Sequence, residues 1–97
     1  MPAVTRLGDY STGDPCGAPP RPSSEGSGDV YANGIPVHRE NDAWEPHACP
    51  GSSPHGATLL AGSGTVFANG KQLGRIGDPI SCGSTVDTGS GDVFAGG

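Results

Sequence analysis

Short alternating segments, each ending in a Gly-rich turn, recur along this chain of 97 residues. The block Gly26–Gly34 returns as Gly62–Gly70 and again, in clipped form, as Gly89–Gly97. In an extended conformation each block places a Val and an Ala on one face and an aromatic residue on the other. Asn-Gly follows in the first two blocks, and this dipeptide favours the type I′ turn of a tight hairpin. The blocks therefore predict short β-strands that enter hairpins.

A second motif, an Arg-x-x-Asp corner, alternates with the blocks. It occurs at Arg6–Asp9, Arg39–Asp42 and Arg75–Asp78. Return strands are expected between turn and corner, at Ile35–Val37 and Lys71–Leu73. We interpret the corners as structural, with Asp binding turn amides and Arg covering neighbouring strands. Gly or Pro interrupts every helical apolar period, so we expect an all-β domain over residues 1–97, with approximate threefold repetition and no significant helix.

Two segments lie outside this pattern. Residues 43–58 separate the first two repeats, contain Trp44 and show no strand pattern of their own. The segment from Asp14 to Pro22 is rich in proline and is expected to be a stiff connecting loop.

The composition indicates that burial of apolar side chains cannot be the sole support of the fold. Gly and Pro occupy 28 of 97 positions, whereas Val, Leu, Ile and Phe together supply 15. Domains this small usually need disulfides, a metal ion or a partner. Three cysteines are an odd number, which favours metal ligation or free thiols over a disulfide framework.

Charge and hydropathy exclude several classes of partner. The net charge of −5 offers no basic surface for nucleic acid. No apolar run approaches the roughly 20 residues of a membrane span, and the first residues lack the layout of a signal peptide. We therefore expect synthesis in the cytoplasm and no nucleic-acid partner.

A metal site is the expected staple. His47 lies five residues after Asp42 and Cys82 four residues after Asp78, so the repeats present donors at nearly equivalent points. Imidazole and thiolate donors suit a closed tetrahedral zinc site that contributes directly to folding. The predicted ligands are His38, His47, His55 and Cys82, with Cys16, Cys49 and Asp14 as alternatives. Zinc is the expected metal and iron the alternative.

Catalysis is not expected, because such a site would engage all three imidazoles and leave none as a general base. The competing interpretations are a small metal-dependent hydrolase and a zinc-stapled adaptor that binds another partner through its Pro-rich loop. An open coordination position would favour the hydrolase.

The corners Arg6–Asp9 and Arg75–Asp78, the blocks, and the run Pro79–Gly83 after the third corner together resemble the PAAR-repeat proteins. The resemblance implies a small cone of β-hairpins whose point is stapled by zinc on three His and one Cys. At the matching positions these are again His38, His47, His55 and Cys82. Gly13-Asp14-Pro15-Cys16 departs from the Gly-His-Gly-Cys run of many relatives.

The same resemblance implies a mechanical function. Such proteins cap the trimeric central spike of contractile phage tails and of type VI secretion systems. We expect one copy per trimer, docked through a base that contains Val30, Val66 and Val93, with only transient contact with the target cell membrane. The chain is expected to be a bare tip without an extension domain, assembled at the end of a virion or secretion spike.

Overall fold

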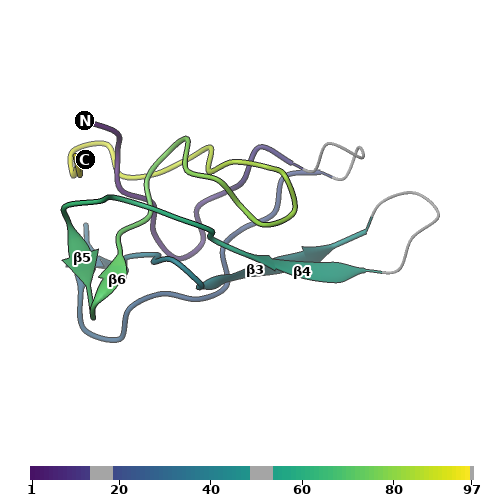
Figure 1. Ribbon diagram of the computed structural model, residues 1–97, viewed down its shortest axis with the longest axis horizontal. Helices are drawn as coiled ribbons and strands as arrows, with labels where there is room; N and C mark the ends of the chain where they lie inside the picture. Colours follow the sequence, from purple (N-terminus) through teal and green to yellow (C-terminus); the bar gives the residue numbers. More distant parts are fainter. Residues whose placement is uncertain (14–18, 49–53, 97) are drawn as a thin grey trace.

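The computed structural model describes residues 1–13, 19–48 and 54–96, and all the regular elements in this part of the chain are short β-strands. The strands pair as three antiparallel hairpins, β1 with β2, β3 with β4 and β5 with β6. Figure 1 labels the strands of the second and third hairpins. Their bounds are β1 Tyr31–Ala32, β2 Ile35–Pro36, β3 Ala43–His47, β4 His55–Thr58, β5 Phe67–Ala68 and β6 Lys71–Gln72. Over the same residues no helix has the length and apolar character needed to cross a bilayer. The predicted all-β fold is confirmed.

The Asn-Gly dipeptides form the predicted turns of two hairpins. Asn33 and Gly34 have φ of 58° and 75°, and Asn69 and Gly70 have φ of 56° and 76°. Two consecutive residues with positive φ are what a type I′ turn requires, and Asn and Gly tolerate this region best. The β1–β2 and β5–β6 hairpins are thus fixed by local backbone preference.

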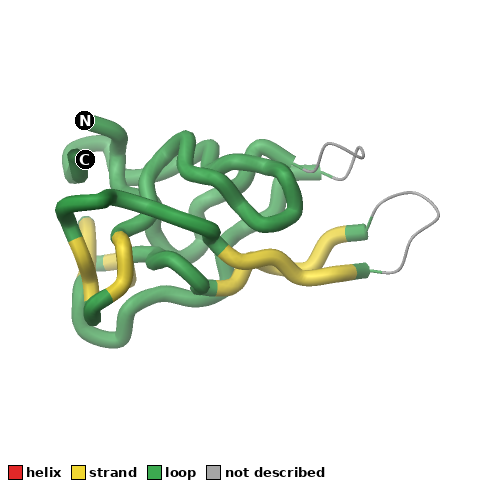
Figure 2. Tube along the Cα trace, viewed as in Figure 1, coloured by secondary structure: helices red, strands yellow, loops and turns green. Residues whose placement is uncertain are grey.

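The third block, Gly89–Gly97, pairs with the N-terminal segment instead of with a return strand of its own. Ala3 forms an antiparallel bridge with Phe94, and the Val4 amide donates to the Val93 carbonyl at 2.9 Å. The two ends of the chain consequently lie together at one end of the molecule (Figures 1 and 2). Residues near the N-terminus therefore serve as the return strand that the third block lacks.

A ring of backbone hydrogen bonds joins the three repeats at their centre. The Thr5 amide donates to the Gly74 carbonyl at 3.0 Å, the His38 amide to the Thr5 carbonyl at 3.0 Å, and the Gly74 amide to the His38 carbonyl at 2.8 Å. Each of these residues directly precedes the Arg of a corner. The closed ring shows that the sequence repeats form an approximate threefold arrangement in space.

Two small apolar clusters flank this ring. The first is threefold in composition and contains Val4, Val37, Leu73, Ala32, Ala68 and Ala95. The second lies against the β3–β4 hairpin and contains Trp44, Ala57, Leu59, Ile80 and Val86. Gly62 allows the chain to pass close to the first cluster, since a Cβ there would lie 2.3 Å from the Leu73 carbonyl oxygen.

The Arg-x-x-Asp corners are structural, as expected. Arg and Asp of each corner form an ion pair, with N to O distances of 2.9, 2.8 and 3.0 Å in chain order. The third corner position needs a positive φ, and Gly8, Asn41 and Gly77 supply it with 88°, 69° and 92°. Gly and Asn accept this conformation at the lowest steric cost.

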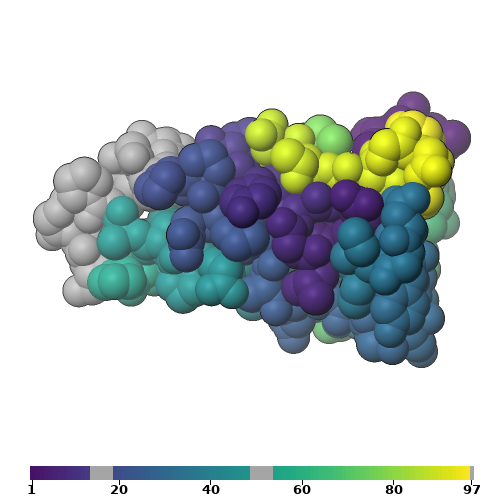
Figure 3. All heavy atoms as spheres, turned by 180° about the vertical axis from the view of Figure 1, so that it is seen from behind, coloured from purple at the N-terminus to yellow at the C-terminus, as the bar shows by residue number. Residues whose placement is uncertain are grey.

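The segment without a predicted strand pattern forms the longest hairpin. β3 and β4 pair Ala43 with Thr58 and Trp44 with Ala57, followed by a register shift before His47 pairs with His55. The sequence pattern did not predict β3 because Pro46 lies within it, and Pro in a short run argues against a strand. The hairpin extends from a broader body, so that the molecule measures 39 × 24 × 21 Å and narrows toward β3 and β4 (Figures 1 and 3).

Candidate functional site

The β3–β4 hairpin brings together two of the predicted metal ligands. His47 at the end of β3 and His55 at the start of β4 are register partners. Their ring centroids are 4.3 Å apart with the planes at 69°. His47 is buried and His55 is exposed. The pair lies at the hairpin end remote from Ala43, and therefore toward the narrow end of the molecule.

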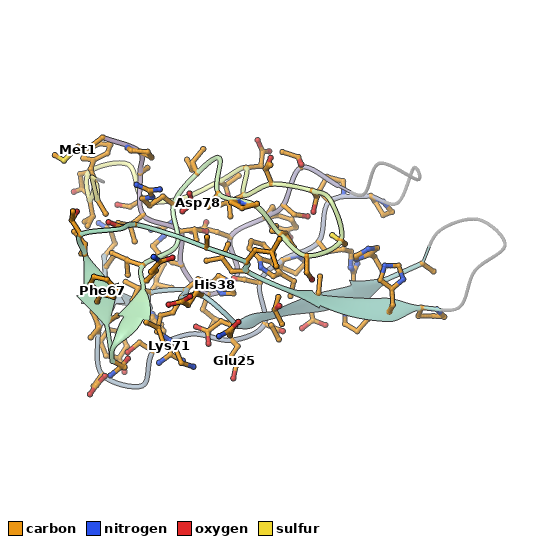
Figure 4. The ribbon with its side chains drawn as sticks, in the orientation of Figure 1. Met1, Glu25, His38, Phe67, Lys71 and Asp78 are labelled. Carbon is orange, nitrogen blue, oxygen red and sulfur yellow. The ribbon has the colours of Figure 1, made fainter. Side chains whose placement is uncertain are left out.

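His38 lies in the interior of the body (Figure 4). Its side chain is completely buried, and its ring packs edge-on against Trp44 with centroids 4.8 Å apart. Trp44 is near the beginning of β3, whereas His47 lies three residues further along it. Three residues of strand span roughly 10 Å. The hairpin thus separates His38 from the His47–His55 pair.

The contacts of His38 fix its ring in the core, and its predicted role as a metal ligand stays a prediction. Its Nδ1 lies 2.7 Å from the Glu25 carbonyl oxygen. A carbonyl can only accept, so Nδ1 carries the proton. Burial lowers the pKa of His38, although the hydrogen bond to the Glu25 carbonyl opposes this effect. The ring is therefore neutral and fastens the first block to the centre of the molecule. Its buried Nε2 has no hydrogen-bond partner among the described residues, so this nitrogen is the one that could bind a metal ion.

The equivalent position in the first corner supports this role. Thr5 directly precedes Arg6, as His38 precedes Arg39, and its hydroxyl donates to the Thr88 carbonyl at 3.0 Å. Thr88 and Glu25 each directly precede the first Gly of a block. Placing the corners in register therefore identifies His38 as a counterpart of Thr5, a signal that the sequence did contain.

Cys82 lies beside the second apolar cluster. It is partly buried and packs against that cluster, with its Sγ 3.0 Å from the Ser84 hydroxyl oxygen. Across residues 1–13, 19–48 and 54–96, no three His, Cys, Asp or Glu side chains are grouped so that they could hold a metal ion. The predicted set of four is therefore not assembled there. The alternative ligands Cys16, Cys49 and Asp14 lie outside the described residues.

The donor chemistry of the His pair nevertheless fits zinc. Two imidazoles on adjoining strands can each direct one nitrogen toward a common ion, and zinc takes His nitrogens together with thiolate or carboxylate ligands. The hairpin supplies two such donors near its outer end. Completing a tetrahedral site requires two more ligands. The candidates are the predicted ligands His38 and Cys82 and the alternatives Cys16, Cys49 and Asp14.

The broad end of the molecule carries one exposed aromatic side chain from each of the three repeats. Tyr31, Phe67 and Phe94 are 55%, 53% and 49% exposed, although each directly precedes a buried Ala of the first cluster. Figure 4 shows Phe67 at this end together with Met1. Side chains of a strand alternate between faces, so burial of the alanines turns one aromatic ring per repeat outward.

The valines predicted to form the base directly precede these aromatic residues in the three blocks. Val30 and Val66 are 37% and 39% exposed, and Val93 is partly buried against the first cluster. The three aromatic residues are more exposed than these valines and were not among the predicted site residues. We call the Val and aromatic residues of the three blocks the base; its members are Val30, Tyr31, Val66, Phe67, Val93 and Phe94.

Fold and surface together define a small all-β repeat cone, with three corners and three hairpin units closed around one axis. A family model for the PAAR motif matches residues 12–88, and the chain belongs to this family. The family is structural rather than enzymatic and is associated with the spike tips of contractile injection systems. No curated protein matches the chain.

Proposed function

We propose that this protein caps the blunt end of the trimeric central spike of a contractile injection machine, a phage tail or a type VI secretion system. The single observation that supports this assignment best is the threefold base, with one exposed aromatic ring from each repeat. Exposed apolar surface of this kind marks a protein interface. The base faces the spike, and the β3–β4 hairpin points toward the target envelope.

One copy serves each trimer in this proposal. A homotrimer with a threefold axis presents three identical patches, and three internal repeats on one chain can meet them one to one. The repeats differ in sequence, so the match is approximate. The protein acts without catalysis as a hard point that contacts the target membrane transiently, after assembly in the cytoplasm onto the spike.

Zinc stiffens the narrow end in the same proposal. His47 and His55 would supply two ligands from facing strands. His38 and Cys82 are the predicted ligands for the remaining positions, and Cys16, Cys49 and Asp14 are the alternatives. A structural zinc site stabilises a small domain by roughly 10 kcal/mol or more. Such a cross-link would hold the long hairpin together under load, with iron as the alternative metal.

The docking proposal is tested by native mass spectrometry of the chain mixed with the purified trimeric spike of its own machine. We expect one chain per spike trimer. Phe67→Ala should weaken docking about tenfold or more, as loss of an aromatic interface anchor does. Leu60→Ala is the matched control, because Leu60 is 56% exposed but lies outside the base. Three chains per trimer, or no complex, would refute the proposal.

The metal proposal is tested by elemental analysis of purified variants. Wild type should carry one zinc per chain, and His47→Ala should lose it. Separate Cys82→Ser, Cys16→Ser, Cys49→Ser and Asp14→Asn variants identify the remaining ligands. A folded His47→Ala variant with full zinc content would refute the role of the His pair.

A further inference from the structure

Two carboxylates lie beside the apolar base. In each block one residue stands between the Gly-Ser-Gly run and the Val of the base. This residue is Asp29 in the first block, Thr65 in the second and Asp92 in the third. All three side chains are exposed. In Figure 1 these chain segments form the end of the body opposite the β3–β4 hairpin. The apolar base therefore has charge at two of three equivalent points.

Neighbouring repeats hold these carboxylates in place. The Asn69 amide donates to Asp29 Oδ1 at 2.6 Å, and the Asn33 amide donates to Asp92 Oδ1 at 2.7 Å. The hydroxyls of Ser27 and Ser90 donate to the same two oxygens at 3.0 Å. All these donors reach Oδ1, so none of them engages Oδ2.

The same hydrogen bonds keep both groups ionised. Donation from Asn69 and then from Ser27 lowers the pKa of Asp29, and donation from Asn33 and then from Ser90 lowers the pKa of Asp92. The lowered pKa values make it harder for either carboxylate to become neutral by taking up a proton when docking removes its water. Arg39 and Arg6 of the same chain also lower these two pKa values, but each donates to the Asn that holds the carboxylate. A carboxylate whose Oδ2 loses its water on docking is therefore stabilised by a cation or strong donors from the partner.

We propose that the blunt end of the trimeric partner carries a Lys or Arg on each subunit beside its apolar patch, and that two of these three cations pair with Asp29 and Asp92. This inference rests on the proposed docking of the base. The third cation faces Thr65, whose hydroxyl already donates to the Gly96 carbonyl at 3.3 Å. The electrostatic match is consequently incomplete in one repeat.

Charge at the rim of an interface acts chiefly on the association rate and on its dependence on salt. The test compares Asp29→Asn/Asp92→Asn with Glu45→Gln/Asp87→Asn, a control that removes the same charge from sites outside the base. Asn keeps the side-chain oxygen that accepts from Asn69 or Asn33. Association with the purified trimeric spike is measured by stopped flow at low and high salt.

We expect the base double variant to associate about tenfold more slowly than its control at low salt, with a smaller salt dependence. Thr65→Asp, checked for an unchanged melting temperature, should associate faster than wild type. Equal rates and salt dependence for the two double variants, or faster association of the base variant, would overturn the inference. Failure of wild type to bind any trimeric spike would instead refute the docking proposal itself.

Discussion

Replacement of His38 tests most directly whether this residue is a structural element of the core or a metal ligand. His38→Ala removes a completely buried ring that packs on Trp44 and binds the Glu25 carbonyl. Deleting a large buried side chain costs about 2–4 kcal/mol through lost transfer energy and cavity formation. A partly buried carbonyl without its donor adds about 1 kcal/mol.

The sum, about 3–5 kcal/mol, is a large share of the roughly 5–15 kcal/mol that stabilises a domain of this size. It corresponds to a fall in melting temperature of about 15–25 °C. His38→Thr is the matched variant, because Thr5 performs the same bond at the equivalent position of the first corner. We expect His38→Thr to recover the hydrogen bond and to lose less stability than His38→Ala.

The assay combines thermal unfolding, followed by circular dichroism, with metal content by elemental analysis on the same samples. His38→Thr should unfold between wild type and His38→Ala, and its metal content decides whether the ring is also a ligand. A folded His38→Thr variant that has lost its metal would show that His38 is a ligand. Equal stability of His38→Ala and wild type would contradict its role in the core.

Three other predictions follow from particular contacts. Because the pKa of His38 is lowered in the folded state, the unfolded chain binds a proton more readily at this residue. The free energy of unfolding should therefore fall as the pH drops below the unfolded pKa of about 6.5, by up to about 1.4 kcal/mol per pH unit. Urea titrations at pH 7 and pH 5 should show a larger loss of unfolding free energy for wild type than for His38→Thr. Gly62→Ala should destabilise by about 3 kcal/mol or more, because its Cβ would lie 2.3 Å from the Leu73 carbonyl oxygen. Gly28→Ala, with no atom within 4 Å of the added Cβ, should melt close to wild type. If the His pair holds zinc, a chelator should lower the melting temperature of wild type and leave a folded His47→Ala variant unchanged, as differential scanning fluorimetry can measure.

The sequence offers the donor residue types of the candidate site, but it does not give the geometry that pairs two of them. His47 and His55 were identified as donors, and the structure makes them register partners. The strands that carry them were not predicted, because Pro46 interrupts the alternation and the hairpin depends on packing of Trp44 in the second cluster. Packing of Trp44 against residues far away in the chain stabilises β3, whereas the local sequence of β3 does not favour a strand.

Features that depend on local backbone chemistry could be predicted from the sequence. The Asn-Gly turns and the Gly or Asn at the third corner position follow from the few residues that accept positive φ. Their recurrence specified three related units, since equal local sequences favour equal local structures.

The closure of these units into one body depends on contacts between distant segments. The ring through Thr5, His38 and Gly74, and the bridge of Ala3 to Phe94, join residues far apart in the chain. Such pairings depend on which segments share the limited apolar surface, and no local pattern encodes that choice. The same closure buries His38 and turns one aromatic ring per repeat outward, so both its structural role and the base arise from the assembled cone.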